Sequence, residues 1–355
     1  MYDNNFIMND SFWKNKRVLV TGHTGFKGGW LTLLLLRLGA NVSGLSLKEN
    51  KKSFFSLCKI KNKINKNFYC DINNYSKLKK IILKNNPEIV FHLAAQPIVI
   101  ESFANPISTL KTNIIGTANL LNSLRLSKKI KSIVIVTSDK CYENTNKKIY
   151  FEEDKLGGSD IYSASKSSCE LITSAFRKSF FLNSKKINIA TARAGNVIGG
   201  GDFAKDRIFP DIVKSYEKKR QCIIRNPSHT RPWQHVLDPI SGYLMLAEKL
   251  YKTKSNRFNS AWNFGPPNEN KSVQDILDIV KSIIPLKMKK NNKNKFNESR
   301  YLNLNSNKSK KYLNWSRKLN FQLSIKMTLD WYLNLQNNKD NFEFTLKQIN
   351  EYLEK

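Results

Sequence analysis

The segment VLVTGHTGFKGGW places the strongest constraint on how this chain can fold. An apolar run is followed at once by Gly22, Gly25 and Gly28, and then by a helix-forming stretch. This order is typical of the first βα turn of a dinucleotide-binding fold. One glycine allows the tight turn, one admits a pyrophosphate close to the backbone, and one lets helix and strand pack together. The helix N-terminus adds free N–H groups and a partial positive charge. The spacing is one residue longer than in the commoner motif, so the strand and helix flanks carry the interpretation. We expect cofactor contacts from Gly22, Thr24, Gly25, Phe26 and Gly28.

Strand and helix patterns alternate through the first half of the chain. Segments such as EIVFHLAA and SIVIVTSDK are apolar on both faces, and amphipathic segments such as YSKLKKIILKN separate them. This alternation predicts a doubly wound, parallel, Rossmann-type α/β sheet that is covered on both sides. The pattern loosens after about residue 200. We therefore expect a dinucleotide-binding domain with the catalytic residues over 12–200, a smaller mixed substrate-binding lobe over 201–340, and a C-terminal tail over 341–355.

The second and third strands bear on which dinucleotide is bound. NVSGLSLKEN has no acid at the strand end, where an acid would bind the adenosine ribose, so the sequence leaves NAD and NADP both open. Asp71 ends the third strand, where it either meets the adenine together with Ile72 or caps the following helix. Leu93 and the small residues Ala94 and Ala95 follow the next strand, and we expect them beside the cofactor.

Acid–base chemistry is predicted where the strand SIVIV runs into TSDKCY. Parallel α/β sheets bind their ligands at the carboxyl ends of the strands. The next helix carries Tyr162 and Lys166 four residues apart, and therefore on one face. A neighbouring ammonium group stabilises a phenolate, which suits the removal of a hydroxyl proton during hydride transfer.

Composition excludes several classes of protein. The formal net charge of +32 by itself suggests a nucleic-acid partner. We favour compositional drift, because the lysines are spread along the chain with asparagine and isoleucine, and no basic face interleaved with aromatic residues occurs. Five irregularly spaced cysteines without a CxxC pair predict reduced thiols and no metal site. No apolar stretch is long enough to span a membrane. We expect a cytoplasmic protein that binds neither nucleic acid nor membranes.

Longer segments carry a family resemblance. They are VTGHTGFKGGWL, VFHLAAQPIV, TNIIGTANLL, VTSDKCYEN, YSASK, RAGNVIGGGDFAKDRIFPDI, IIRNP, RPWQHVLDPISGYL and WNFGP. Between about residues 12 and 335, the chain resembles the extended short-chain dehydrogenase/reductase family, and within it the nucleotide-sugar 4,6-dehydratases that act on CDP-glucose. The resemblance implies an NAD-dependent hydro-lyase of deoxysugar and polysaccharide biosynthesis. Such an enzyme converts CDP-glucose to CDP-4-keto-6-deoxyglucose and water.

The resemblance also implies roles for the catalytic residues. Tyr162, assisted by Lys166, takes the proton from the hydroxyl on sugar carbon 4, Ser138 hydrogen-bonds the same oxygen, and hydride passes to NAD. Asp139 is the candidate acid for the hydroxyl that leaves carbon 6, to which the hydride returns. Lys140 stands where dehydratases for other nucleotide sugars carry glutamate. It is either the base for the proton on carbon 5 or a group that orients water and balances charge, because a lysine beside a carboxylate is normally protonated.

Contacts with the nucleotide sugar are expected from the second half of the chain. Asn196, Arg207 and Arg231 are candidates for binding the diphosphate and cytidine, although either arginine could equally form a surface salt bridge. Gln96 and His235 are candidates for facing the sugar, whereas we expect His92 to be packed at a strand end. In similar enzymes the two long helices TNIIGTANLLNSL and SSCELITSAF pair between subunits, so a homodimer is expected.

Two other interpretations stay open. A dehydratase or epimerase acting on GDP-mannose, dTDP-glucose or a UDP-sugar would share the fold and cofactor. An epimerase needs no elimination acid, so Asp139 disfavours it. A catalytically inactive dinucleotide-binding scaffold, or an RNA-binding relative that uses the positive charge, is disfavoured by the intact set Ser138, Asp139, Tyr162 and Lys166.

Overall fold

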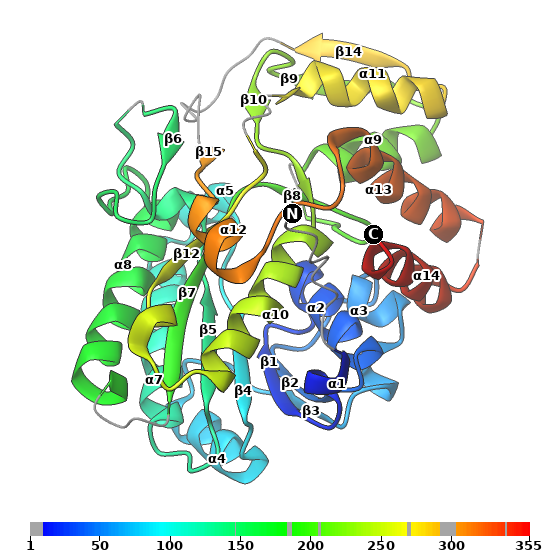
Figure 1. The fold of residues 1–355 in the computed structure, drawn as a ribbon. Helices are drawn as coiled ribbons and strands as arrows, with labels where there is room; N and C mark the ends of the chain where they lie inside the picture. Colours follow the sequence, from blue (N-terminus) through cyan, green and yellow to red (C-terminus); the bar gives the residue numbers. More distant parts are fainter. Residues whose placement is uncertain are drawn as a thin grey trace, which may run out of the picture.

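A seven-stranded sheet, parallel throughout, forms the centre of the molecule (Figure 1). The computed structural model describes residues 10–145, 147–182, 187–204, 207–267, 271–291, 303–337 and 339–355. The strand order is β12-β7-β5-β4-β1-β2-β3. The strands span β1 (Arg17–Thr21), β2 (Asn41–Ser46), β3 (Lys66–Tyr69), β4 (Ile89–His92), β5 (Ser132–Val136), β7 (Asn188–Ala194) and β12 (Ala261–Phe264). This order confirms the predicted doubly wound α/β fold.

Helices cover both faces of the sheet because successive strand side chains point to opposite sides. In β1, Val18 and Val20 belong to one hydrophobic core, and Leu19 belongs to the other. The first core is covered by α2 (Phe26–Arg37) and α10 (Leu237–Lys252). The second is covered by α4 (Tyr75–Asn85), α7 (Gly116–Leu124) and α8 (Ile161–Phe176). The apolar strands of the sequence are thus buried on both faces.

Segments after residue 200 contribute both to the sheet and to a separate group of elements. The edge strand β12 and the covering helix α10 come from this part of the chain, so the sheet draws on both sides of the expected boundary at residue 200. The group beyond the strand ends contains α9 (Ile208–Glu217), α11 (Val273–Ile283) and α13 (Phe321–Gln336) with short strand pairs (Figure 1). Residues 341–353, expected as part of a tail, form helix α14 and pack against α13 and α2. The division into functional domains remains a prediction.

The remaining helices and strands are short or peripheral. Their bounds are α1 (Asp10–Trp13), α3 (Phe54–Leu57), α5 (Val99–Ala104), α6 (Pro106–Leu110), α9 (Ile208–Glu217), α11 (Val273–Ile283), α12 (Asn307–Leu313), α13 (Phe321–Gln336), α14 (Asn341–Leu353), β6 (Ile149–Tyr150), β8 (Val197–Ile198), β9 (Cys222–Arg225), β10 (Thr230–Arg231), β11 (Gln234–His235), β13 (Lys271–Ser272), β14 (Met288–Asn291) and β15 (Asn303–Leu304). All five cysteines are buried and free of disulfides, as predicted. Within the described ranges, no helix is long and apolar enough to cross a membrane, and no cluster of side chains suits a metal ion.

The turn between β1 and α2 depends on its glycines. Gly22 has a φ of 74°, a left-handed conformation that favours glycine. A Cβ at Gly22 would lie 2.6 Å from the backbone nitrogen of Ala94. A Cβ at Gly28 would lie 2.1 Å from the carbonyl oxygen of Gly22, whereas one at Gly25 would meet that oxygen at 3.3 Å. Gly28 is therefore the position where α2 packs against the strand end.

We predict that Gly28→Ala destabilises the fold far more than Gly25→Ala. Alanine favours a helix over glycine by about 1 kcal/mol, but overpacking against backbone typically costs about 1–3 kcal/mol or more. At Gly28 the clash should outweigh the gain in helix propensity, so the substitution should lower the free energy of unfolding by more than about 1 kcal/mol. Urea unfolding of both variants measures the difference. Equal stability of the two variants would contradict the packing role of Gly28.

Candidate active site

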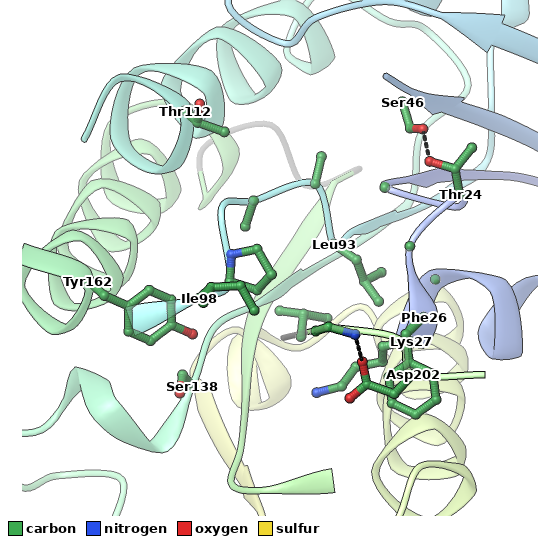
Figure 2. Close-up of a pocket in the computed structure, with 18 of the residues that line it drawn as sticks. Thr24, Phe26, Lys27, Ser46, Leu93, Ile98, Thr112, Ser138, Tyr162 and Asp202 are labelled. Atoms are coloured by element: carbon green, nitrogen blue, oxygen red, sulfur yellow. Dashed lines mark hydrogen bonds between the residues drawn. The ribbon is translucent and has the colours of Figure 1, made fainter. Parts of the chain in front are cut away.

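A cavity of about 1150 Å³ opens at the carboxyl ends of the parallel strands (Figure 2). Its walls come from the segments that follow β1, β2, β3, β4, β5 and β7, together with α8 and the chain beyond residue 200. Most of the site residues expected from the sequence line it. They are Gly22, Thr24, Gly25, Phe26, Gly28, Asp71, Ile72, Leu93, Ala94, Ala95, Ser138, Asp139, Lys140, Tyr162, Lys166, Asn196, Arg207 and Arg231.

The end of the cavity beside the glycine turn has the features of a dinucleotide site. Gly25 is the N-cap of α2 and offers no capping side chain, so the helix N-terminus faces the cavity with backbone N–H groups. Thr24 and Ser46 are joined by a hydrogen bond between their hydroxyl groups and line the same wall (Figure 2). β2 ends at Ser46 with no acid, as in the sequence, and the carboxylate of Glu49 accepts a hydrogen bond from the Tyr69 hydroxyl at 2.9 Å.

Asp71 lines the cavity without capping a helix. Its carboxylate accepts hydrogen bonds from the backbone and side-chain nitrogens of Asn73, at 2.8 and 3.0 Å. The N-cap of α4 is Asn74, which accepts from the backbone N–H of Lys77. Of the two roles left open for Asp71, the structure gives the cap to Asn74 and leaves Asp71 at the cavity wall.

The turn after β5 holds its three polar residues in one hydrogen-bonded unit. The Ser138 hydroxyl donates to Asp139 at 2.7 Å and accepts from the backbone N–H of Lys140 at 3.2 Å. Residues Asp139–Cys141 form a single 3₁₀ turn that Ser138 caps. Burial raises the pKa of Asp139, although Lys140, Ser138, Arg231 and Lys27 all oppose this. A raised pKa favours the protonated form, which is the form that a general acid needs.

Tyr162 and Lys166 lie on α8, across the cavity from the glycine turn. Both side chains are buried, and the Lys166 Nζ is 5.9 Å from the centre of the Tyr162 ring. Figure 2 shows the Tyr162 hydroxyl directed toward Ser138. Asn113, in the π-helix Lys111–Ile115, donates to the Ser165 hydroxyl at 2.8 Å and accepts from the backbone of Gln96. This buried amide connects the helix of Tyr162 to the loop after β4.

Two expected sugar contacts lie elsewhere. The Gln96 side chain closes its own loop, because it donates to Ile98 and Thr109 and accepts from the backbone of Ile98. His235 is fully buried, packs edge-on against Trp30, and does not line the cavity. Neither side chain lines the cavity in this structure, and a sugar contact from either residue stays a prediction. His92 is packed at the end of β4 between Thr21 and Thr117, as predicted.

Lys27 is a cavity residue that the sequence analysis missed. It is the second residue of α2 and lines the cavity at the N-terminus of that helix (Figure 2). Its Nζ is 3.5 Å from the Tyr243 hydroxyl. Burial and the positive charges of Lys166 and Arg207 lower the pKa of Lys27 to about 8, against the pull of Asp139. The lysine is visible in the segment GFKGG, but the glycines around it favoured an interpretation in terms of backbone contacts.

We predict that Lys27→Met raises the melting temperature at pH 7 by a few degrees. The folded-state pKa of about 8 lies below the ordinary value of 10.5, so folding must bury a disfavoured charge below pH 8. That cost shrinks as the pH rises from 8 toward 10, so the gain should fade by pH 9.5. Thermal melts at both pH values measure it. The exposed Lys14→Met is the control, and a gain that persists unchanged at pH 9.5 would contradict the prediction.

Comparisons with known proteins agree with this geometry. A model of the family described as GDP-mannose 4,6 dehydratase matches residues 19–328. The chain is 40% identical over 356 residues to the CDP-glucose 4,6-dehydratase of Salmonella typhimurium, covering 98% of this chain and 99% of that one. Among solved structures, an epimerase of Methanothermobacter thermautotrophicus has a TM-score of 0.80 at 24% identity, covering 94% of this chain and 97% of that one. The dTDP-glucose 4,6-dehydratase of Bacillus anthracis, in complex with NAD, has a TM-score of 0.76 at 21% identity and covers 92% and 99%. These two structures share the fold.

Proposed function

Since this chain belongs to the GDP-mannose 4,6 dehydratase family, we propose that it is an NAD-dependent hydro-lyase that converts CDP-glucose to CDP-4-keto-6-deoxyglucose and water. The choice of substrate rests on the 40% identity to a CDP-glucose 4,6-dehydratase over nearly the full length of both chains. The reaction type is supported by one observation above all. A buried acid with a raised pKa, Asp139, lines the same cavity as Tyr162 and Lys166.

The residues around the glycine turn fit NAD. Gly22 and Gly28 have no room for a side chain, and the first turn of α2 offers N–H groups to a pyrophosphate. Asp71 and Ile72 would contact the adenine end, and Leu93, Ala94 and Ala95 would lie along the cofactor. When bound, NAD would supply the hydride acceptor for sugar carbon 4 and the hydride donor for carbon 6. We also propose that residues 12–200 supply these cofactor contacts.

Tyr162 and Ser138 act on the hydroxyl of carbon 4. The Tyr162 phenolate oxygen takes the hydroxyl proton, and the Ser138 hydroxyl hydrogen-bonds the same oxygen. Lys166, one helical turn from Tyr162, stabilises the phenolate by its charge. The oxygen of carbon 4 becomes a ketone, which acidifies the proton on carbon 5.

Asp139 and Lys140 act on carbons 5 and 6. A proton leaves carbon 5, and the Asp139 carboxylic acid donates a proton to the hydroxyl on carbon 6, which departs as water. Lys140 is beside Asp139 at the cavity wall and serves carbon 5 as the base itself or by orienting a water. Epimerisation at carbon 4 would need no elimination acid, so the buried Asp139 favours the dehydratase over the epimerase.

The nucleotide end of the substrate is assigned to residues of the cavity's remaining wall. Asn196, Arg207 and Arg231 line it, and the two arginines suit a diphosphate through their planar guanidinium groups. Because Arg207 and Arg231 both come from residues 201–340, we propose that this part of the chain supplies most nucleotide-sugar contacts. Free, buried cysteines further support a cytoplasmic location.

The test of this function uses CDP-glucose labelled with deuterium on carbon 4, incubated with the protein and catalytic NAD. We expect loss of water and recovery of the label on carbon 6, read by mass spectrometry and NMR. Tyr162→Phe should lower kcat by roughly 100-fold to 10,000-fold because it removes the acid–base group. The matched control is Tyr251→Phe, whose hydroxyl bonds Glu88 outside the cavity. A label that stays on carbon 4 would overturn the dehydratase proposal for this substrate.

We also propose that the protein is a homodimer built on the outer face of its helices. Large apolar side chains are exposed on the π-helix Lys111–Ile115, α8 and the π-helix Arg177–Phe181, away from the cavity lining. They are Ile115 (51% exposed), Leu171 (58%) and Phe180 (43%). α8 contacts both π-helices, so these side chains belong to one packed layer. An apolar layer of this kind favours a second copy of the chain.

Ile115→Asp combined with Leu171→Asp should shift the protein from dimer to monomer. Each aspartate would place a charge in the proposed interface, where its desolvation opposes association. Light scattering after gel filtration measures the mass. The control is Ile223→Asp, which alters a similarly exposed isoleucine on β9. A wild-type protein that elutes as a monomer would exclude the dimer.

A further inference from the structure

A buried ion pair lies behind the catalytic turn, and the proposed chemistry makes no use of it. The carboxylate of Glu170 and the guanidinium of Arg193 are 2.9 Å apart, and each side chain is only 3% exposed. Neither residue lines the cavity. Burial disfavours both charges, yet Arg193 and the hydroxyl groups of Thr137 and Thr191 lower the pKa of Glu170. The pair is therefore ionised at neutral pH.

Glu170 connects the helix of Tyr162 to the start of the catalytic turn. Tyr162, Lys166 and Glu170 are spaced by four residues on α8, so they share one face of the helix. One carboxylate oxygen of Glu170 accepts from the hydroxyl of Thr137, the residue directly before Ser138, at 2.5 Å. The other oxygen accepts from the hydroxyl of Thr191 on β7 at 2.6 Å, and from Arg193.

Arg193 reaches the end of the same turn. Its Nη1 donates to the Tyr142 hydroxyl at 2.7 Å and to the carbonyl of Glu152 at 3.0 Å, and its guanidinium lies 4.8 Å from the centre of the Tyr142 ring. The Tyr142 hydroxyl donates in turn to Asn263 on β12 at 2.8 Å. The segment from Thr137 to Tyr142, which contains Ser138, Asp139 and Lys140, is thus bonded at both ends to one ion pair.

A buried ion pair is a poor source of stability, because removing two charges from water cancels much of their attraction. Such a pair can instead select one arrangement of the groups that bond to it, since each charge requires its partners. Here the partners are the two ends of the catalytic turn, the helix of the base and strand β7. We propose that Glu170 and Arg193 are positioning residues that fix the turn carrying Ser138, Asp139 and Lys140 against the helix carrying Tyr162.

The role of these residues in catalysis rests on the proposed function, because the turn matters for rate only if its side chains perform the elimination. A misplacement of about 1 Å can cost about 100-fold in rate. The effect should therefore appear in kcat, with KM little changed, because the substrate's nucleotide end is bound by other residues.

The test compares two matched variants, Thr137→Val and Thr191→Val. Each replaces a buried threonine and removes one hydroxyl group from Glu170, so both should lower the melting temperature to a similar extent. Only Thr137 belongs to the catalytic turn. We expect Thr137→Val to lower kcat by about 10-fold to 100-fold with KM within about 2-fold, and Thr191→Val to keep kcat within about 3-fold of wild type. Thr137→Ser retains the hydroxyl and should restore most of the rate.

Amide hydrogen exchange of the peptide that covers 137–142 provides a readout that needs no substrate. Faster exchange in Thr137→Val, with exchange near the wild-type rate in Thr191→Val, supports the positioning role. The same kcat and the same exchange in both variants would overturn it and leave the pair as core packing only. If wild-type protein leaves CDP-glucose unchanged, the proposed function fails, and the exchange comparison still decides whether the pair holds the turn.

Discussion

Parallel pairing of the strands is the constraint on which the whole site depends. Because β1, β4, β5 and β7 run in the same direction, their carboxyl ends meet at one edge of the sheet. The residues that directly follow each of these strands therefore line the same cavity. Gly22 after β1 and Asn196 after β7 are far apart in sequence, yet both line that cavity. The backbone of Gly22 also lies close to the backbone of Ala94, so a side chain at residue 22 would have no space there.

The same convergence explains what the sequence could predict. The glycine turn, the SDK turn and the Tyr162–Lys166 pair are local patterns on recognisable elements, and parallel order alone brings them together. The orientation of Gln96 was not predictable in this way, because its amide is fixed by Thr109 in a neighbouring helix. His235 similarly packs on Trp30, a residue distant in the sequence. The segment AWNFG is recognisable as a strand, but its place at the edge of the central sheet was not predictable, since it follows the region where the alternation of strands and helices fades.

Positively charged side chains outnumber carboxylates in the cavity lining. This excess disfavours the charged form of a buried lysine, but it suits an anionic ligand. The cationic side chains that line it are Lys27, Lys52, Lys111, Lys140, Lys166, Arg207 and Arg231, against the carboxylates of Asp71, Asp139 and Asp202. Burial, together with the positive charges of Lys166 and Arg207, disfavours the charged form of Lys27 and lowers its pKa. The excess suits anionic ligands that carry phosphate groups, and it would be relieved when they bind. The affinity of the cavity for anions therefore follows from the particular lysines and arginines that line it and does not require the high net charge of the whole chain.

Burial at the cavity shifts the pKa values of an acid and an amine in opposite directions. Burial raises the pKa of Asp139 despite the opposing positive groups around it, and burial lowers the pKa of Lys27 despite the attraction of Asp139. Desolvation always disfavours the charged form, so it moves a carboxyl group upward and an amine downward. General acid–base catalysis is most efficient when both pKa values approach the working pH. The carboxyl group of Asp139, which the fold buries at the strand ends, is therefore held toward the protonated form that a general acid needs.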